Sequence, residues 1–326
     1  MLCFSLRGVV VTLPPAHCRS KVENTNNERL LAGLAAVEAL ARGSKVQRWV
    51  QHPFRYAAAI LHRRLCYPLF RRSWLQRASL FWGGTMQVAL PAATDIFLTG
   101  GKTHPSETRL ARFMIRDLSV NSVFFDVGAH YGYFSLLAAE LAFRGQVHAF
   151  EPSTHTFGIL QRNVAAQQRI RAHHVAVSRT DGEIPFYEFD NLHSEYNSAD
   201  AHQFSGEAWF KKHARKTSIR SLSLDRFVDG GALLPTHVKI DVEGLEPEVI
   251  GGAQRLLSGQ SKPVFMLEYL ARQRGNEPHR EAHHLLLEMG YRSFRIGDDG
   301  ALLPTEDVDA YLEQSGLDSD NVVYRA

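Results

Sequence analysis

The chain has 326 residues, of which 44% are hydrophobic and 22% are charged, and its formal net charge is +3. This composition excludes a chain too polar to fold and suits one large domain or two modest ones. The absence of an 18-residue apolar run argues against a hydrophobic transmembrane helix. Three cysteines without a C-x-x-C spacing argue against a disulfide framework or a zinc site, and favour a reducing compartment such as the cytoplasm.

Charge is distributed unevenly along the chain. Residues 1–80 hold 13 Lys/Arg and 3 Asp/Glu, a net of +10, whereas the remainder holds 24 and 31, a net of −7. A basic segment ahead of an acidic body predicts a separate arm that meets an anionic surface. We expect that surface to be something other than nucleic acid.

The basic extension over residues 1–80 is expected to be partly helical. Residues 1–30 are polar and turn-prone, which predicts poor order, and residues 30–41 are strong helix formers. Residues 47–82 mix aromatic side chains, leucines and arginines. Two interpretations stay open: helices that cover the body, with arginine stems lying on apolar surface, or a basic amphipathic surface that contacts an anionic membrane peripherally.

A hairpin and linker is predicted for residues 81–105. Residues 85–90 and 94–100 both alternate in polarity and are separated by Pro91, which is typical of two short strands.

From residue 106 onward the pattern changes to strands alternating with helices. A helix with Ser106 as a possible cap comes first, and strand and helix patterns then follow each other to a last strand at "NVVYRA". This alternation predicts an α/β fold with a doubly wound, mostly parallel sheet over residues 106–326. Residues 190–218 form a long insert, which is expected to be a lid or a surface loop.

The stretch "FFDVGAHYGYFS" predicts a nucleotide-binding turn between a strand and a helix. A dinucleotide fold would show G-x-G-x-x-G around a pyrophosphate, but one glycine is missing here and Asp126 stands two residues before Gly128. A carboxylate beside a pyrophosphate would be repelled by roughly 1 to 4 kcal/mol. The same carboxylate suits the ammonium and sulfonium of S-adenosylmethionine, so we expect that cofactor.

Two further acids follow later strands. Glu151 ends "VHAFE", 23 residues after Gly128, where a carboxylate can accept hydrogen bonds from ribose hydroxyls. Asp181 lies in a loop after the third strand, where adenine would need an acceptor, although the Asp181–Gly182 turn explains it equally well.

The stretch "HVKIDVEG" predicts a catalytic strand end. Lys239, Asp241 and Glu243 alternate, so they point to one side of a strand expected to neighbour the first. Asp241 is the candidate base or acceptor-orienting group. Lys239 would tune Asp241 or bind the donor side, and Glu268 at the end of the fifth strand could hold the acceptor. Asp241 and Glu243 could also bind a hard cation, but we expect no required metal.

These motifs together resemble a known family. "FDVGAHYGYFS", "VHAFEP", "HVKIDVEGLEPEVIGGA" and "LLEMGYRSFRI", in this order, resemble the FkbM-type S-adenosylmethionine-dependent methyltransferases. The resemblance implies a class I methyltransferase fold with a seven-stranded sheet and one reversed strand, and it implies O-methylation of a hydroxyl on a sugar, a glycolipid or a related metabolite. The residues expected at the cofactor are Asp126, Gly128, Ala129, His130, Tyr131, Gly132, Glu151, Pro152 and Asp181.

Two departures from the family pattern stand out. His130 stands where the family often has Asn, and the long insert makes the acceptor hard to carry over from relatives. The alternatives are an NAD-dependent oxidoreductase, which Asp126 and the missing glycine disfavour, and a methyltransferase-like domain that only binds a partner through its basic arm.

Overall fold

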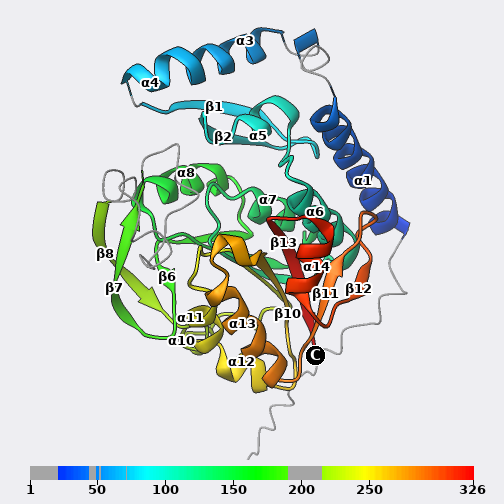
Figure 1. Cartoon of the computed structure of the whole chain (residues 1–326), viewed down its shortest axis with the longest axis vertical. Coiled ribbons are helices and arrows are strands. Elements are labelled where there is room, and N and C mark those ends of the chain that lie inside the picture. The colour runs from blue at the N-terminus through cyan, green and yellow to red at the C-terminus, as the bar shows by residue number, and fades with distance from the viewer. Residues whose placement is uncertain (1–20, 44–48, 51–52, 71, 190–214) are drawn as a thin grey trace, which may run out of the picture.

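A computed structural model describes residues 21–43, 49–50, 53–70, 72–189 and 215–326. Figure 1 shows a central sheet with helices on both faces, a hairpin and helical layer lying against one end of it, and α1 running along the side. Among the described residues no helix is both long and apolar enough to cross a membrane.

The central sheet has eight strands in the order β12-β11-β13-β10-β9-β3-β4-β5. β3, β4, β5, β9, β10 and β11 run in one direction, whereas β13 is antiparallel to both of its neighbours and β12 is antiparallel to β11. The strands are β3(Val123–Val127), β4(Gln146–Phe150), β5(Ile170–His173), β9(His237–Ile240), β10(Val264–Leu270), β11(Arg292–Ile296), β12(Leu302–Pro304) and β13(Ser319–Arg325).

This strand order confirms the doubly wound sheet and the class I methyltransferase fold, including the reversed strand β13 between β10 and β11. The expected number of seven strands is wrong by one. The eighth strand, β12, is three residues long and pairs only with the edge strand β11. A strand this short carries no hydrophobic alternation, so the sequence pattern did not indicate it.

Both faces of the sheet are covered because successive strand residues point to opposite sides. Phe124 and Phe125 of β3 are each fully buried, in two different apolar clusters. The first cluster includes residues of α1, α6, α7 and α8, and the second includes residues of α10 to α14. These helices are α6(Pro105–Asp117), α7(Tyr133–Leu141), α8(Thr154–Val164), α10(Leu224–Asp229), α11(Glu246–Gly251), α12(Gln254–Ser258), α13(Glu277–Glu288) and α14(Val308–Ser315), with the 3₁₀ turn η3(Arg272–Arg274) before α13.

A small separate sheet lies beside β5. It has three strands in the order β6-β8-β7, namely β6(Ala176–Val177), β7(Gly182–Glu188) and β8(Arg215–Leu222). The predicted insert 190–218 falls between β7 and β8. Its residues 190–214 lie outside the described residues, and its last four residues belong to β8.

The segment before the central sheet corrects three expectations. Its elements are α1(Lys21–Arg42), α3(Pro53–Leu61), the π-helical turn η1(His62–Cys66), α4(Tyr67–Phe70), β1(Trp74–Ser79), β2(Thr85–Leu90) and α5(Thr94–Thr99). The hairpin joins β1 to β2, and residues 94–99 are a helix instead of its second strand. Ile96 and Phe97 are consecutive and both buried, which a helix packed between two elements allows more readily than a half-buried strand.

Two helix starts also differ from the expectation. α1 begins at Lys21, well before residue 30. Leu30, Leu34 and Val37 form a buried stripe, and the Arg29 guanidinium just before it donates to Glu140 and to the backbone oxygen of Trp82. α6 begins at Pro105 with no side-chain cap, and the Ser106 hydroxyl instead lies 2.8 Å from His104 Nδ1.

Candidate active site

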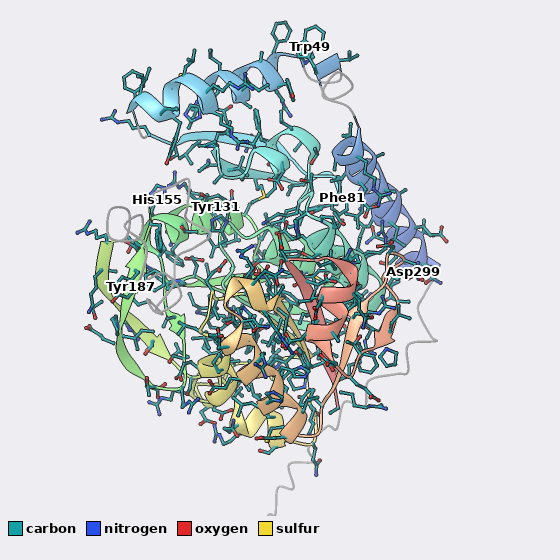
Figure 2. The ribbon with its side chains drawn as sticks, viewed as in Figure 1. Trp49, Phe81, Tyr131, His155, Tyr187 and Asp299 are labelled. Carbon is teal, nitrogen blue, oxygen red and sulfur yellow. The ribbon has the colours of Figure 1, made fainter. Side chains whose placement is uncertain are left out.

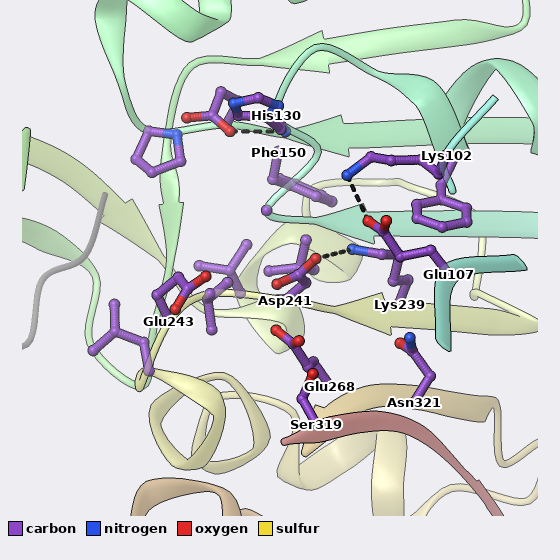
Figure 3. A pocket seen from close by; sticks show the side chains of 18 of the residues that line it. Lys102, Glu107, His130, Phe150, Lys239, Asp241, Glu243, Glu268, Ser319 and Asn321 are labelled. Carbon is purple, nitrogen blue, oxygen red and sulfur yellow. Dashed lines mark hydrogen bonds and ion pairs between the residues drawn. The ribbon is translucent and has the colours of Figure 1, made fainter. Parts of the chain in front are cut away.

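A cavity of about 390 Å³ lies at the carboxyl ends of β3, β4, β9 and β10, where parallel α/β sheets bind ligands. Figure 3 shows its wall, with Asp241 and Lys239 at the centre, His130 at one end, and Glu268, Ser319 and Asn321 at the other.

The glycine turn forms the first wall. Gly128, His130 and Gly132 all have positive φ, at 79°, 50° and 89°. A Cβ on Gly128 would lie 1.8 Å from the backbone oxygen of Asp241, so only glycine lets the turn after β3 approach the end of β9. A Cβ on Gly132 would lie 2.6 Å from Leu160 Cδ1, which places α8 directly against the turn.

Glu151 joins the turn to β4. It is buried, and its two carboxylate oxygens accept hydrogen bonds from the backbone N–H of His130 and of Ser153, each at 2.9 Å. Burial raises the pKa of Glu151 to about 7 despite these bonds. Glu151 also lines the cavity, so the carboxylate can accept further bonds from a ligand there.

Lys239 is a buried cation between two carboxylates. Its Nζ lies 2.9 Å from Asp241 Oδ2 and 3.9 Å from Asp126 Oδ1, and 5.3 Å from the centre of the Phe134 ring. The side chain is only 3% exposed. Burial alone would lower the pKa of Lys239, but Asp241 and Asp126 outweigh it and raise that pKa, so the lysine stays charged.

Asp126 does not line the cavity, which differs from its expected contact with the cofactor. Its Oδ2 accepts a hydrogen bond from the Ser135 hydroxyl at 2.5 Å, and its Oδ1 has no hydrogen-bond partner. The side chain is fully buried behind Lys239, and burial raises its pKa. Asp126 therefore positions Lys239 and the start of α7 from below the turn.

Three carboxylates meet at the centre of the cavity. One oxygen from each of Asp241, Glu243 and Glu268 lies within 4.8 Å of the others, a grouping that could hold a cation. Burial would raise the pKa of Asp241, but Lys239 outweighs it and holds that pKa below its usual value. Burial and the neighbouring Asp241 raise the pKa of Glu268 to about 8. Asp241 therefore has a lowered pKa and Glu268 a raised one.

The profile of the methyltransferase FkbM domain matches residues 126–293, which is half of the chain. The chain belongs to the FkbM methyltransferase family. Membership in this family implies S-adenosylmethionine as the cofactor and disfavours the oxidoreductase alternative. The site fits this cofactor, because a turn without a Cβ at Gly128 faces a cavity in which carboxylates such as Glu151 and Asp241 outnumber the cations.

The chain is also similar to individual proteins. A hexuronic acid methyltransferase, AglP from Haloferax volcanii, is 28% identical over 153 residues, covering 46% of this chain and 58% of its own. The match thus spans less than two thirds of that relative. The FkbM methyltransferase structure from Methylobacillus flagellatus KT is 17% identical, with a TM-score of 0.42 over 72% of this chain and 52% of that one. Aeropyrum pernix fibrillarin with bound S-adenosyl-L-methionine is 10% identical, with a TM-score of 0.36 over 67% and 74%.

Part of the cavity wall of this FkbM protein lies outside the matched residues. Lys102 Nζ lies 2.5 Å from Glu107 Oε1 on the wall facing Asp241, and Asp95 of α5 is beside them. From the other end of the chain, Ser319 and Asn321 of β13 complete the same wall. Sequence analysis missed these five residues. No motif marks them, because segments more than 200 residues apart come together only in the folded chain.

The remaining predicted cofactor residues fall into two groups. Gly128, His130 and Pro152 line the cavity with Glu151, whereas Ala129, Tyr131 and Gly132 shape the turn without lining it. Burial, with Lys102 and Lys239, lowers the pKa of His130 to about 3, so its ring is neutral.

Asp181 lies outside the cavity. Its Oδ1 accepts a hydrogen bond from the backbone N–H of Ser223, 42 residues away, at 2.8 Å, and the expected adenine contact stays a prediction.

Proposed function

We propose that this methyltransferase transfers the methyl group of S-adenosylmethionine to a hydroxyl of a sugar, free or carried on a lipid. The observation that carries the proposal is one continuous cavity. It runs from the glycine turn and Glu151 past Asp241 to a wall of short polar and charged side chains. A sugar presents many hydroxyls, and each needs a polar partner when it leaves water. The similarity to a hexuronic acid methyltransferase supports the same acceptor class.

The cofactor end would be held by backbone and one carboxylate. Glu151 would accept hydrogen bonds from the ribose hydroxyls, and Gly128 would let the cofactor lie against the turn. When bound, S-adenosylmethionine supplies a methyl group that is electrophilic because its sulfur is positively charged. The carboxylates around the cavity favour that charge.

The acceptor end would provide the base. The hydroxyl proton must pass to the protein as the new O–C bond forms, and a carboxylate in reach is the ordinary acceptor. Glu268 suits this role better than Asp241, the first choice from the sequence, because Lys239 makes Asp241 the weaker base. Asp241 stays ionised and would orient the hydroxyl through its free lone pairs, with Glu243 beside it.

The charges of the cavity favour a neutral sugar over a uronate. Among the described lining residues, carboxylates outnumber lysine and arginine, and Lys102 is already paired with Glu107. A second carboxylate on the acceptor would meet Asp241 and Glu268. Lys102 and Lys239 are both paired with acids, so among the described lining residues only Arg274 is left to receive that carboxylate. The acceptor of the relative AglP is by its name a hexuronic acid, so this chain would differ from it in the charge of the sugar.

The test is methyl transfer from labelled S-adenosylmethionine to a panel of neutral sugars, matched uronates and amines. We expect transfer to neutral sugars, loss of turnover in Asp241→Asn and Glu268→Gln with cofactor binding retained, and weaker cofactor binding in Glu151→Ala. Calorimetry with NAD serves as the negative control. Transfer only to amines or only to uronates would overturn the proposed acceptor. Cofactor binding without transfer to any member would favour the non-catalytic alternative.

A further inference from the structure

The segment ahead of the catalytic domain carries a row of exposed apolar side chains. They lie on α3, η1 and α4, which form the outermost layer of the molecule, and on β1 next to that layer (Figure 1). We call this surface the outer face. Figure 2 shows Trp49 at one end of it, pointing away from the body. The outer face consists of Phe54, Leu61, Leu65, Leu69, Phe70, Trp74 and Leu75, whose exposed fractions run from 37% for Leu75 to 88% for Phe54.

The outer face is preformed because its opposite side is anchored. Ala59, His62 and Tyr67 are buried on that opposite side. The His62 ring lies 5.8 Å from the Trp74 ring, and its Nε2 lies 3.2 Å from the backbone oxygen of Arg72. Phe54, Leu61, Leu65 and Leu69 are spaced by seven, four and four residues, which puts them on one side of the helices. The chain therefore holds an apolar stripe outward at a fixed position.

Positive charge accompanies this stripe without any acid. Between Glu38 and Asp95 the sequence has nine Lys/Arg and no Asp or Glu. Arg63, Arg64 and Arg72 are exposed among the apolar side chains. A large exposed apolar patch indicates a surface that is covered in function. Arginines interleaved with leucine and aromatic side chains match anionic headgroups above acyl chains, whereas a nucleic acid would leave the leucines uncovered.

The outer face is also connected to the cavity. α5 lies between them: the Arg55 guanidinium of α3 lies 5.6 Å from the Phe97 ring, while the neighbouring Asp95 and Ile96 line the cavity. One helix, α5, therefore separates the outer face from the cavity wall that includes Asp95 and Ile96.

We propose that the outer face docks this protein onto a bilayer that contains anionic phospholipid. Binding combines insertion of the apolar stripe into the headgroup region with attraction between the arginines and the headgroups. Docking onto the bilayer does not depend on which acceptor is methylated. If that acceptor is a sugar carried on a lipid, docking also brings the sugar to the cavity, and this one step rests on the proposed function.

The experiment is co-sedimentation of the full chain with vesicles of phosphatidylcholine alone or with 30% phosphatidylglycerol, at low and high salt. The first variant is Leu61→Ser/Leu65→Ser, each leucine 55% exposed. Its matched control is Leu233→Ser/Leu234→Ser, exposed by 52% and 53%, in the loop before β9 at the opposite end of the sheet from the cavity. The second variant is Arg63→Gln/Arg64→Gln, which removes charge and leaves the stripe.

We expect binding to anionic vesicles that weakens with salt. Loss of the two leucines should weaken it by about tenfold or more, and loss of each arginine by roughly fivefold at low salt. The control variant should bind as the unaltered chain does. Equal binding to neutral vesicles, equal loss in the control, or no vesicle binding would overturn the proposal. So would light scattering that shows the stripe covered by a second copy of the chain.

Discussion

The two ends of the cavity are built in different ways. At the cofactor end the structure relies on backbone: positive φ at Gly128 and Gly132, and main-chain N–H groups that bind Glu151. At the acceptor end it relies on paired side chains such as Lys239 with Asp241 and Lys102 with Glu107. A backbone-built end tolerates almost no change, whereas a wall of side chains can be altered one group at a time.

Gly128→Ala should have the largest effect, because its Cβ would lie 1.8 Å from the Asp241 backbone oxygen and the ends of β3 and β9 would have to separate. We expect a loss of more than about 4 kcal/mol in the free energy of unfolding and no measurable cofactor binding. Gly231→Ala is the matched control, since Gly231 also has positive φ, at 95°, but nothing lies within 4 Å. Equal melting temperatures for the two variants would contradict a backbone-built end.

Lys239→Met removes the cation that lies between Asp126 and Asp241. It leaves Asp126 buried without a counter-charge, so we expect about 3 to 5 kcal/mol less stability in urea unfolding. Adding Asp126→Asn should restore part of that loss, because the amide needs no cation. The exposed Lys216, replaced in the same way, should change stability by less than about 0.5 kcal/mol. No restoration in the double variant would show that Asp126 does not depend on Lys239.

Glu268 should set the pH dependence of turnover. A base must be deprotonated, and burial with the nearby Asp241 raises the pKa of Glu268 to about 8. We therefore expect kcat/KM to rise with pH through about 8. Glu268→Gln should lower kcat about 100-fold and remove the rise, while the exposed Glu288→Gln on α13 should keep both. A rise that survives Glu268→Gln would assign the proton transfer to another group.

His130→Asn should have the smallest effect. Asparagine tolerates the φ of 50° at this position, the backbone N–H to Glu151 remains, and the neutral imidazole takes no charge with it. Cofactor affinity should change less than about threefold, or about 0.7 kcal/mol. A β-branched His130→Val, strained at positive φ, should weaken calorimetric binding clearly more. A large loss in His130→Asn would give the ring a direct role.

Sequence patterns predicted what the local chain conformation determines. The alternation of strands and helices gave the sheet, and the glycine turn, Glu151 and Asp241 were expected at neighbouring strand ends, where the structure has them. Glu151 and Asp241 could be placed because each directly follows a buried strand. The position of the Asp126 side chain outside the cavity could not be predicted in this way, since it depends on contacts with Ser135 and Lys239 from two other elements.

The parts that were missed depend on contacts between distant segments. Residues 94–99 alternate like a strand, yet they form a helix because Ile96 and Phe97 are both buried. Lys102 and Asn321 line the same cavity although they lie more than 200 residues apart in the sequence. A single sequence does not predict that these two segments line one cavity, because neither the residues around Lys102 nor those around Asn321 resemble a binding motif.

The position of β13 has a consequence for synthesis. It follows β10 and β11 in the sequence, yet it inserts between them. A nascent chain that lacks residues 319–325 has two open sheet edges where β10 and β11 should be bridged, and it lacks Ser319 and Asn321 in the cavity. Translation must therefore pass this strand before the domain can close, and products that stop short of it expose edges that chaperones and proteases recognise.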